Sequence, residues 1–162
     1  MSNEGIAITE YKYDDNGNEV LRQFFDKDNK PTKGYIGFAQ KAYTYDDKGH
    51  MLSDRYYDVK NELVLVDGIA GNNYKRDGHG NIIEEFPIGT DQKIAKGKLM
   101  VRYKYDDKDN LIELAVFDAD GKPAINSNDI HKYTQKFNNR NQCIETCYYN
   151  TKGELTPYSD HN

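Results

Sequence analysis

Cysteine and long apolar runs are both scarce in this sequence. Only two of the 162 residues are cysteines, Cys143 and Cys147. Two are too few for a disulfide framework, and their spacing differs from that of a Cys-x-x-Cys redox or zinc pair. No 18 consecutive residues are apolar, and the first ten lack the basic and apolar segments of an export signal. We therefore expect a soluble chain without membrane insertion and without an export signal of its own.

Apolar residues in general are also few, at 36% against 30% charged, whereas globular domains usually reach about 45–50%. We do not expect a large globular core. Tyrosine, in contrast, occurs 14 times. Its ring buries apolar area while its hydroxyl stays in contact with water, so tyrosines can hold together a structure with a thin interior.

Clusters of positive charge are missing as well. The net charge is −5, and lysines and arginines form no dense patch, which argues against nucleic acid as a partner. The histidines form no i, i+4 pair of the kind that binds metal. They are His50, His79, His131 and His161.

The chain repeats one unit five times. The stretch YKYDDNGNEVLRQFFD, Tyr11 to Asp26, returns as YKYDDKDNLIELAVFD, Tyr103 to Asp118, and aligned units begin 32, 31, 29 and 32 residues apart. Such a period predicts a repeat architecture. We interpret the chain, 1–162, as a single array with a leading segment 1–10 and repeats 11–42, 43–73, 74–102, 103–134 and 135–162.

Each unit reads as an aromatic-x-aromatic strand, a polar turn, a second strand ending in aromatic-Asp, and a second polar turn. The loop Asp14 to Gly17 suits a type I turn closed by a left-handed glycine. We predict a β-hairpin plus a short third strand in each unit. Gly49→Val should therefore lower the melting temperature, because a β-branched residue resists the left-handed region.

The residue period within the strands predicts the fold class. Tyr11 and Tyr13 share one face and Lys12 lies on the other, and no segment shows a capped helical period. We predict an all-β fold of tandem antiparallel β-hairpin repeats, about 31 residues each, forming an extended meander or a β-solenoid-like curved sheet. Stacked tyrosines would form ladders between hairpins.

Two apolar columns in the second strands lie five residues apart. An odd separation places them on opposite faces of a regular strand, so either a β-bulge intervenes or both faces are covered. The aliphatic column is Val20, Leu52, Ile83, Ile112 and Ile144, and the other column is Phe25, Tyr57, Ile88, Phe117 and Tyr149.

The recurring Tyr-x-Tyr-Asp-x-x-Gly-Asn, as in Tyr11 to Asn18, resembles the tyrosine-aspartate (YD) repeats of bacterial Rhs-type and related surface proteins. The second half of the unit, as in YYDVKNELVLVDG and VFDADGKPAIN, is similar to bacterial cell-wall-binding repeats. The resemblance covers about 150 residues. It implies an extended all-β repeat in a large bacterial protein that shells a toxin, sits on a cell surface or binds carbohydrate, and it implies no catalytic residues.

The aspartate-rich second turns are candidates for calcium, which takes six to eight oxygen ligands. The candidate ligands are Asp26, Asp28, Asp118 and Asp120. The same residue types are also usual in hairpin turns, and that interpretation is the simpler one. We expect no other cofactor.

Aromatic residues beside the second turns are the candidates for ligand binding. Adjacent strand residues point to opposite faces, so both members of a pair cannot enter one thin core. The candidates are Tyr56, Tyr57, Phe117, Tyr148 and Tyr149. A column of lysines could meet an acidic partner, although solvent-facing lysines also discourage sheet aggregation. It comprises Lys12, Lys75, Lys104 and Lys136, with Thr44 in the second repeat.

The function that these features favour is a non-enzymatic β-repeat module with an elongated binding or shell-forming surface, in a bacterial surface or secreted protein. Its partner would be a protein or a carbohydrate. The alternatives are a carbohydrate-binding repeat that uses the second-turn aromatics and, less favoured, a hydrolase. A hydrolase would gather unrepeated polar residues, and the irregular stretch FPIGTDQK, Phe86 to Lys93, is where they would be sought.

Overall fold

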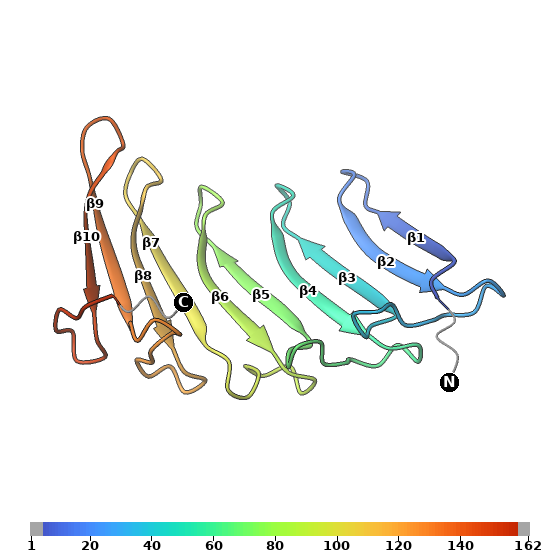
Figure 1. The fold of residues 1–162 in the computed structure, drawn as a ribbon. Helices are drawn as coiled ribbons and strands as arrows, with labels where there is room; N and C mark the ends of the chain where they lie inside the picture. The colour runs from blue at the N-terminus through green and yellow to red at the C-terminus, as the bar shows by residue number, and fades with distance from the viewer. Residues whose placement is uncertain (1–4, 159–162) are drawn as a thin grey trace. The chain divides into compact units, whose positions relative to one another are not determined.

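The computed structural model describes residues 5–158, and in this range every regular element is a β-strand. Ten antiparallel strands form one sheet whose order follows the chain, as five successive hairpins (Figure 1). The predicted all-β meander of hairpins is therefore confirmed. The strands are β1 (Ile8–Tyr13), β2 (Glu19–Phe25), β3 (Gln40–Tyr45), β4 (Met51–Tyr57), β5 (Gly71–Arg76), β6 (Ile82–Ile88), β7 (Met100–Tyr105), β8 (Leu111–Phe117), β9 (Lys132–Phe137) and β10 (Cys143–Tyr149).

The described chain divides into two compact units. The first holds residues 5–74 and 87–95, and the second holds 75–86 and 96–158, so that β5 and β6 contribute to both. Residues 1–4 of the predicted leading segment and 159–162 of the predicted fifth repeat, with His161, lie outside the described residues.

The first turn of each hairpin is built as its sequence predicts. The Gly17 N–H donates to the Asp14 carbonyl at 3.0 Å, and φ is 85° at Gly17 and 82° at Gly49. The Asp14 Oδ1 accepts from the backbone N–H groups of Asn16 and Asn18. The side-chain hydrogen bond from Asn18, followed by its backbone hydrogen bond, lowers the pKa of Asp14. Aspartate is favoured here because its carboxylate satisfies turn N–H groups that have no partner in the strands.

A β-bulge accounts for the odd spacing of the two apolar columns. In the first hairpin Lys12 pairs with Leu21 and Tyr13 pairs with Glu19, so that Val20 is passed over. The same register shift occurs in the hairpins β3–β4, β7–β8 and β9–β10. The residues passed over are Val20, Leu52, Ile112 and Ile144, four members of the predicted aliphatic column.

Each hairpin has a tyrosine face and a lysine face, because successive strand residues point to opposite sides. The Arg22 guanidinium lies over the Tyr11 ring on one side, whereas Lys104 pairs with Glu113 on the other. We define the tyrosine face by Tyr11, Tyr13, Tyr43, Tyr45, Tyr74, Tyr103 and Tyr105, and the lysine face by Lys12, Thr44, Lys75, Lys104 and Lys136.

The segment after each second turn packs on the tyrosine face. The predicted third strand is reduced to one bridge to the preceding strand in each repeat, such as Phe25 with Pro31, and the second repeat has a further bridge between Val66 and Ile69. In the first unit the Phe38 ring lies between those of Phe24 and Tyr56, with centroids 5.3 and 5.0 Å away. The buried apolar residues are Phe24, Phe38, Ala39, Ala70, Ile88 and Ala95 in the first unit and Met100, Ala115, Val116 and Ile130 in the second.

Candidate functional site

The lysine face of the second unit carries an ordered network of charges. Each of three carboxylates is paired with one or two cations from neighbouring strands. Glu84 pairs with Lys75 at 2.5 Å and with Arg102 at 2.9 Å, Glu113 pairs with Lys104 at 2.8 Å and with Lys132 at 3.6 Å, and Glu145 pairs with Lys136 at 2.6 Å. Five cations thus meet three carboxylates, an excess of two positive charges on an acidic chain.

The outer lysines of this network extend into solvent, whereas its central carboxylates are largely covered. The side chains of Lys75, Lys104 and Lys136 are 63%, 69% and 70% exposed, whereas those of Glu84 and Glu113 are 13% and 22% exposed. Burial works to raise the pKa of both glutamates, but hydrogen bonds from their cationic neighbours lower it overall. Both therefore stay ionised, and the surface above them is dominated by ammonium groups.

An open hollow of about 580 Å³ lies within this network. Ile83, Ala115 and Phe117 give it apolar walls, and the charged residues form its margin. The Arg102 guanidinium carbon lies 4.5 Å from the centre of the Phe117 ring, and the His131 ring meets the same ring edge-on at 5.3 Å. The predicted binding residue Phe117 therefore lies in the hollow, with cations around it.

The predicted aromatics of the first unit lie on two faces of one strand. Tyr56 is half-buried against Phe38, with the Lys41 ammonium 4.8 Å from the centre of its ring. Tyr57 is also half-buried and bridges Leu63. The separation of the pair onto opposite faces follows the alternation on which the prediction rested.

The C-terminal pair is divided in the same way. The Tyr149 ring carries the Lys132 ammonium 4.8 Å from its centre. Tyr148 contacts Tyr133 and Tyr158, with ring centroids 6.4 and 5.1 Å away, and lines an open hollow of about 290 Å³. Amide and hydroxyl side chains complete this hollow, from Asn126, Asn128, Gln135 and Thr146. The five predicted aromatics therefore occupy separate environments.

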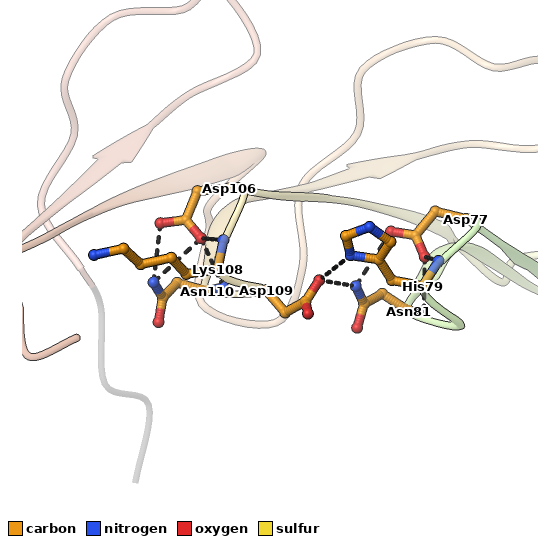
Figure 2. A network of polar contacts seen from close by, with 7 residues as sticks. All are labelled: Asp77, His79, Asn81, Asp106, Lys108, Asp109 and Asn110. Carbon is orange, nitrogen blue, oxygen red and sulfur yellow. Dashed lines mark hydrogen bonds and ion pairs between the residues drawn. The ribbon is translucent and has the colours of Figure 1, made fainter.

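The tips of the hairpins β5–β6 and β7–β8 are tied together by polar contacts, which Figure 2 shows. Asp109 Oδ1 lies 2.9 Å from His79 Nδ1 and accepts from Asn81 Nδ2 at 2.7 Å. Asp109 adopts the left-handed position that glycine holds in the first three hairpins. The hydrogen bonds from His79 and then Asn81 lower the pKa of Asp109. This link could not be predicted from the sequence, because its members lie 28 and 30 residues apart.

A buried ion pair in the first unit was also not predicted from the sequence. Asp54 is only 2% exposed, and its Oδ2 lies 3.4 Å from Lys41 Nζ, while Asn72 and Tyr74 donate to Oδ1. The Lys41 ammonium also lies over the rings of Tyr43 and Tyr56, at 5.1 and 4.8 Å. Although burial opposes it, the charge of Asp54 contributes most to the raised pKa of Lys41. The pair joins β3 to β4.

The calcium candidates serve as turn residues. Asp26 Oδ1 accepts from the N–H groups of Asp28 and Lys30, and Asp118 Oδ1 accepts from those of Asp120 and Lys122. Asp120 Oδ2 also lies 3.9 Å from the Lys122 ammonium. Residues 5–158 contain no group of three or more His, Cys, Asp or Glu that could hold a metal ion. Calcium binding at these turns stays a prediction.

The irregular stretch of the third repeat also forms a turn. Gly89 N donates to the Lys93 carbonyl at 2.8 Å, Gln92 N donates to Gly89, and Asp91 Oδ1 accepts from Lys93 N. Gln92 takes the left-handed conformation, with φ of 61°. These contacts make the stretch equivalent to the second turns of the other repeats. Hydrolase activity stays a prediction.

The described part of the chain has no helix that is long and apolar enough to cross a bilayer. No family model matches the chain, and no curated protein matches it. Among solved structures, one of the Photorhabdus luminescens Tc holotoxin pore is similar over 91% of this chain, with 14% identity and a TM-score of 0.46. This chain spans 10% of the length of that one. Membership of the tyrosine-aspartate repeats stays an expectation from the sequence.

Proposed function

We propose that this protein is a non-enzymatic β-repeat module that binds an acidic protein segment on the lysine face of its second unit. One observation carries the proposal: the lysines are exposed, and the ionised carboxylates beneath them are less exposed and already paired with cations. Since the excess positive charge has no partner within the network, it is available to carboxylates from outside. Complementary charge of this kind promotes encounter and sets the register of binding.

The apolar walls of the hollow add to this surface. A segment that combines acidic and apolar side chains could place an apolar group near Ile83 and Ala115 while its carboxylates reach Arg102 and Lys104. Arg102 is already held by Glu84 and Phe117 and is therefore positioned before a ligand arrives. The first unit differs, because on this face Gln23 contacts Gln40, Thr44 contacts Ser53, and the Arg55 guanidinium donates to the Asn73 side chain rather than to a carboxylate.

The test is a fluorescence-anisotropy titration of a labelled glutamate-rich peptide with the full chain, at low and at physiological salt. We expect saturable binding that weakens as salt rises. Lys104→Gln combined with Lys136→Gln should reduce affinity at least about five-fold, since charge contacts at a rim contribute about 0.5 kcal/mol or more each. Lys12→Gln, on the same face in the first unit, is the matched control. Equal loss in the control, or no binding by the parent chain, contradicts the proposal.

A second candidate is carbohydrate binding in the hollow beside Tyr148. Three tyrosine rings and several amide side chains line it, and sugars are bound by ring stacking combined with amide hydrogen bonds. A glycan array, run with calcium and again with a chelator, tests it. Binding that is lost in Tyr148→Ala but kept in Tyr57→Ala would support this hollow, and loss with chelator would bring in the aspartate turns. If folded protein binds no glycan either with calcium or with chelator, this second candidate is contradicted.

A further inference from the structure

Neighbouring repeats pair through one constant register. Counting from the first aromatic position of each repeat, residue +10 pairs with residue −1 of the next repeat. This holds for Leu21 with Ala42, Ser53 with Asn73, Glu84 with Arg102 and Glu113 with Thr134. Residue +11 pairs with −2 in all four cases, and +12 with −3 in three.

Two further contacts recur where repeats meet. The N–H of residue +13 donates to the carbonyl of residue −4, as in Phe24 to Ala39 at 3.0 Å and Val116 to His131 at 2.9 Å. Pro87 stands at +13 in the third repeat and has no N–H to donate, and β6 pairs with β7 over two residue pairs only.

The second contact uses the hydroxyl of the second tyrosine. Tyr45 donates to the carbonyl of Glu19 at 2.9 Å, and Tyr105 donates to that of Ile82 at 3.1 Å. In both cases the acceptor is the first residue of the preceding repeat's second strand. The junction between repeats is therefore a built interface with defined partners.

Among the described residues, β1 and β10 each carry one half of this junction and lack the other half. Each pairs with a single strand in the described sheet. Tyr13 corresponds to Tyr45 and Tyr105, yet it is 60% exposed, and no described residue accepts from its hydroxyl. Ile144 is 64% exposed, whereas Leu52 and Ile112 at the same position are only partly exposed. An edge strand that has no second partner within the described residues is a template for another strand.

We infer that the β1 edge of one copy of this protein docks on the β10 edge of a second copy in the register of the internal junctions. Thr9 would then lie opposite Thr146 and Ile8 opposite Cys147. The Tyr148 N–H would donate to the Ala7 carbonyl, and the Tyr13 hydroxyl would donate to the Cys143 carbonyl. This contact is head-to-tail, so it grows beyond a dimer unless it closes into a ring.

One residue pair in this register is electrostatically unfavourable, and it provides a specific test of the inference. Glu10 would lie opposite Glu145, where the internal junction of the second unit has Glu84 opposite Arg102 at 2.9 Å. Lys136, 2.6 Å from Glu145, offsets part of the repulsion. Glu10→Arg should therefore tighten self-association by about two- to five-fold, because a cross-strand ion pair replaces like charges. Adding Glu145→Arg to that variant should reverse the gain.

The direct test is disulfide trapping of the full chain in a Cys143→Ser background. Ile8→Cys places a thiol opposite the native Cys147, at a separation that paired strands allow a disulfide to bridge. We expect covalent dimers and larger species on a non-reducing gel, with the linkage to Cys147 verified by mass spectrometry. Thr9→Cys, which points to the other face, should give at least about ten-fold less, since a one-residue shift reverses every side chain.

Sedimentation of the unmodified protein completes the test. Its mass should rise with concentration, and more steeply for Glu10→Arg. A constant monomer mass for both, or equal trapping by Ile8→Cys and Thr9→Cys, would overturn the inference. The trapping outcome is independent of the acidic-peptide titration, because Ile8, Thr9 and Cys147 lie outside the charge network of the second unit. Glu145 belongs to that network, so Glu145→Arg is used only in the sedimentation experiment.

Discussion

Replacing Lys41 should show how much free energy of unfolding is lost when the buried Asp54 carboxylate has no paired cation. The Asp54 carboxylate is almost fully buried, and Lys41 is the cation paired with its Oδ2. Breaking a buried pair by removing one partner typically costs about 3–5 kcal/mol. Asn72 and Tyr74 still donate to Oδ1, and the Lys41 side chain is itself 22% exposed. We therefore expect Lys41→Met to lower the free energy of unfolding by about 2–3 kcal/mol.

A double-mutant cycle assigns this loss to the pair. Lys41→Met combined with Asp54→Leu should recover most of it, because an apolar pair of similar volume replaces the buried charges. The measurement is urea unfolding at neutral pH, with Lys12→Met as the control on the exposed face. If Lys41→Met falls within about 0.5 kcal/mol of the parent chain, which is the range of ordinary surface changes, the ion pair does not support Asp54 and the reasoning is refuted.

Three further substitutions test the junction between repeats, the close backbone approach of Gly71 to Asp54, and the stability of the fold at alkaline pH. Tyr45→Phe should cost about 1 kcal/mol, for the lost hydrogen bond to Glu19, whereas Tyr13→Phe at low protein concentration should cost almost nothing; equal effects in urea unfolding would contradict the junction contact. Gly71→Ala should cost about 2–3 kcal/mol, because φ is 146° and a Cβ would overlap the Asp54 carbonyl oxygen; an unchanged melting temperature would show that the backbone adapts freely. Burial, and then Glu85, raises the pKa of Tyr103 above its ordinary 10.0, so the stability that this neutral phenol contributes is present below pH 10.0 and is lost as pH rises above it. Tyr103→Phe should flatten that decline in unfolding experiments across pH 10.0, and an unaltered decline would rule out Tyr103 as its source.

The repeat pattern was enough to predict the hairpins. Turn aspartates and glycines recur at fixed offsets, and alternation within strands separates Tyr11 and Tyr13 from Lys12, so local chemistry determines each hairpin. The spacing of the two apolar columns indicated a bulge as one of two explanations, and the register shift at Val20 selects it. The predicted third strand became a single bridge, because a short segment with one paired residue satisfies the turn without a full ladder.

The charged site could be predicted only in part. The lysine column is visible in the sequence, but its carboxylates are set by cross-strand register, which places Glu84 beside Arg102, 18 residues away. Asp54 and Lys41 were missed for the same reason, since nothing in a single repeat marks them as partners. Two of the four calcium candidates, Asp26 and Asp118, accept hydrogen bonds from turn N–H groups, a role that has the same sequence signature, and calcium binding stays a prediction.

Nuclear magnetic resonance tests the central claim most directly, because a chain of 162 residues permits residue-by-residue assignment. Titration with a glutamate-rich peptide should shift the side-chain signals of Lys75, Lys104 and Lys136 and leave those of Lys12 nearly unchanged. That result would locate an acidic partner on the lysine face of the second unit. Shifts confined to the tyrosine face or the hairpin tips, or equal shifts at Lys12, would contradict the proposed function.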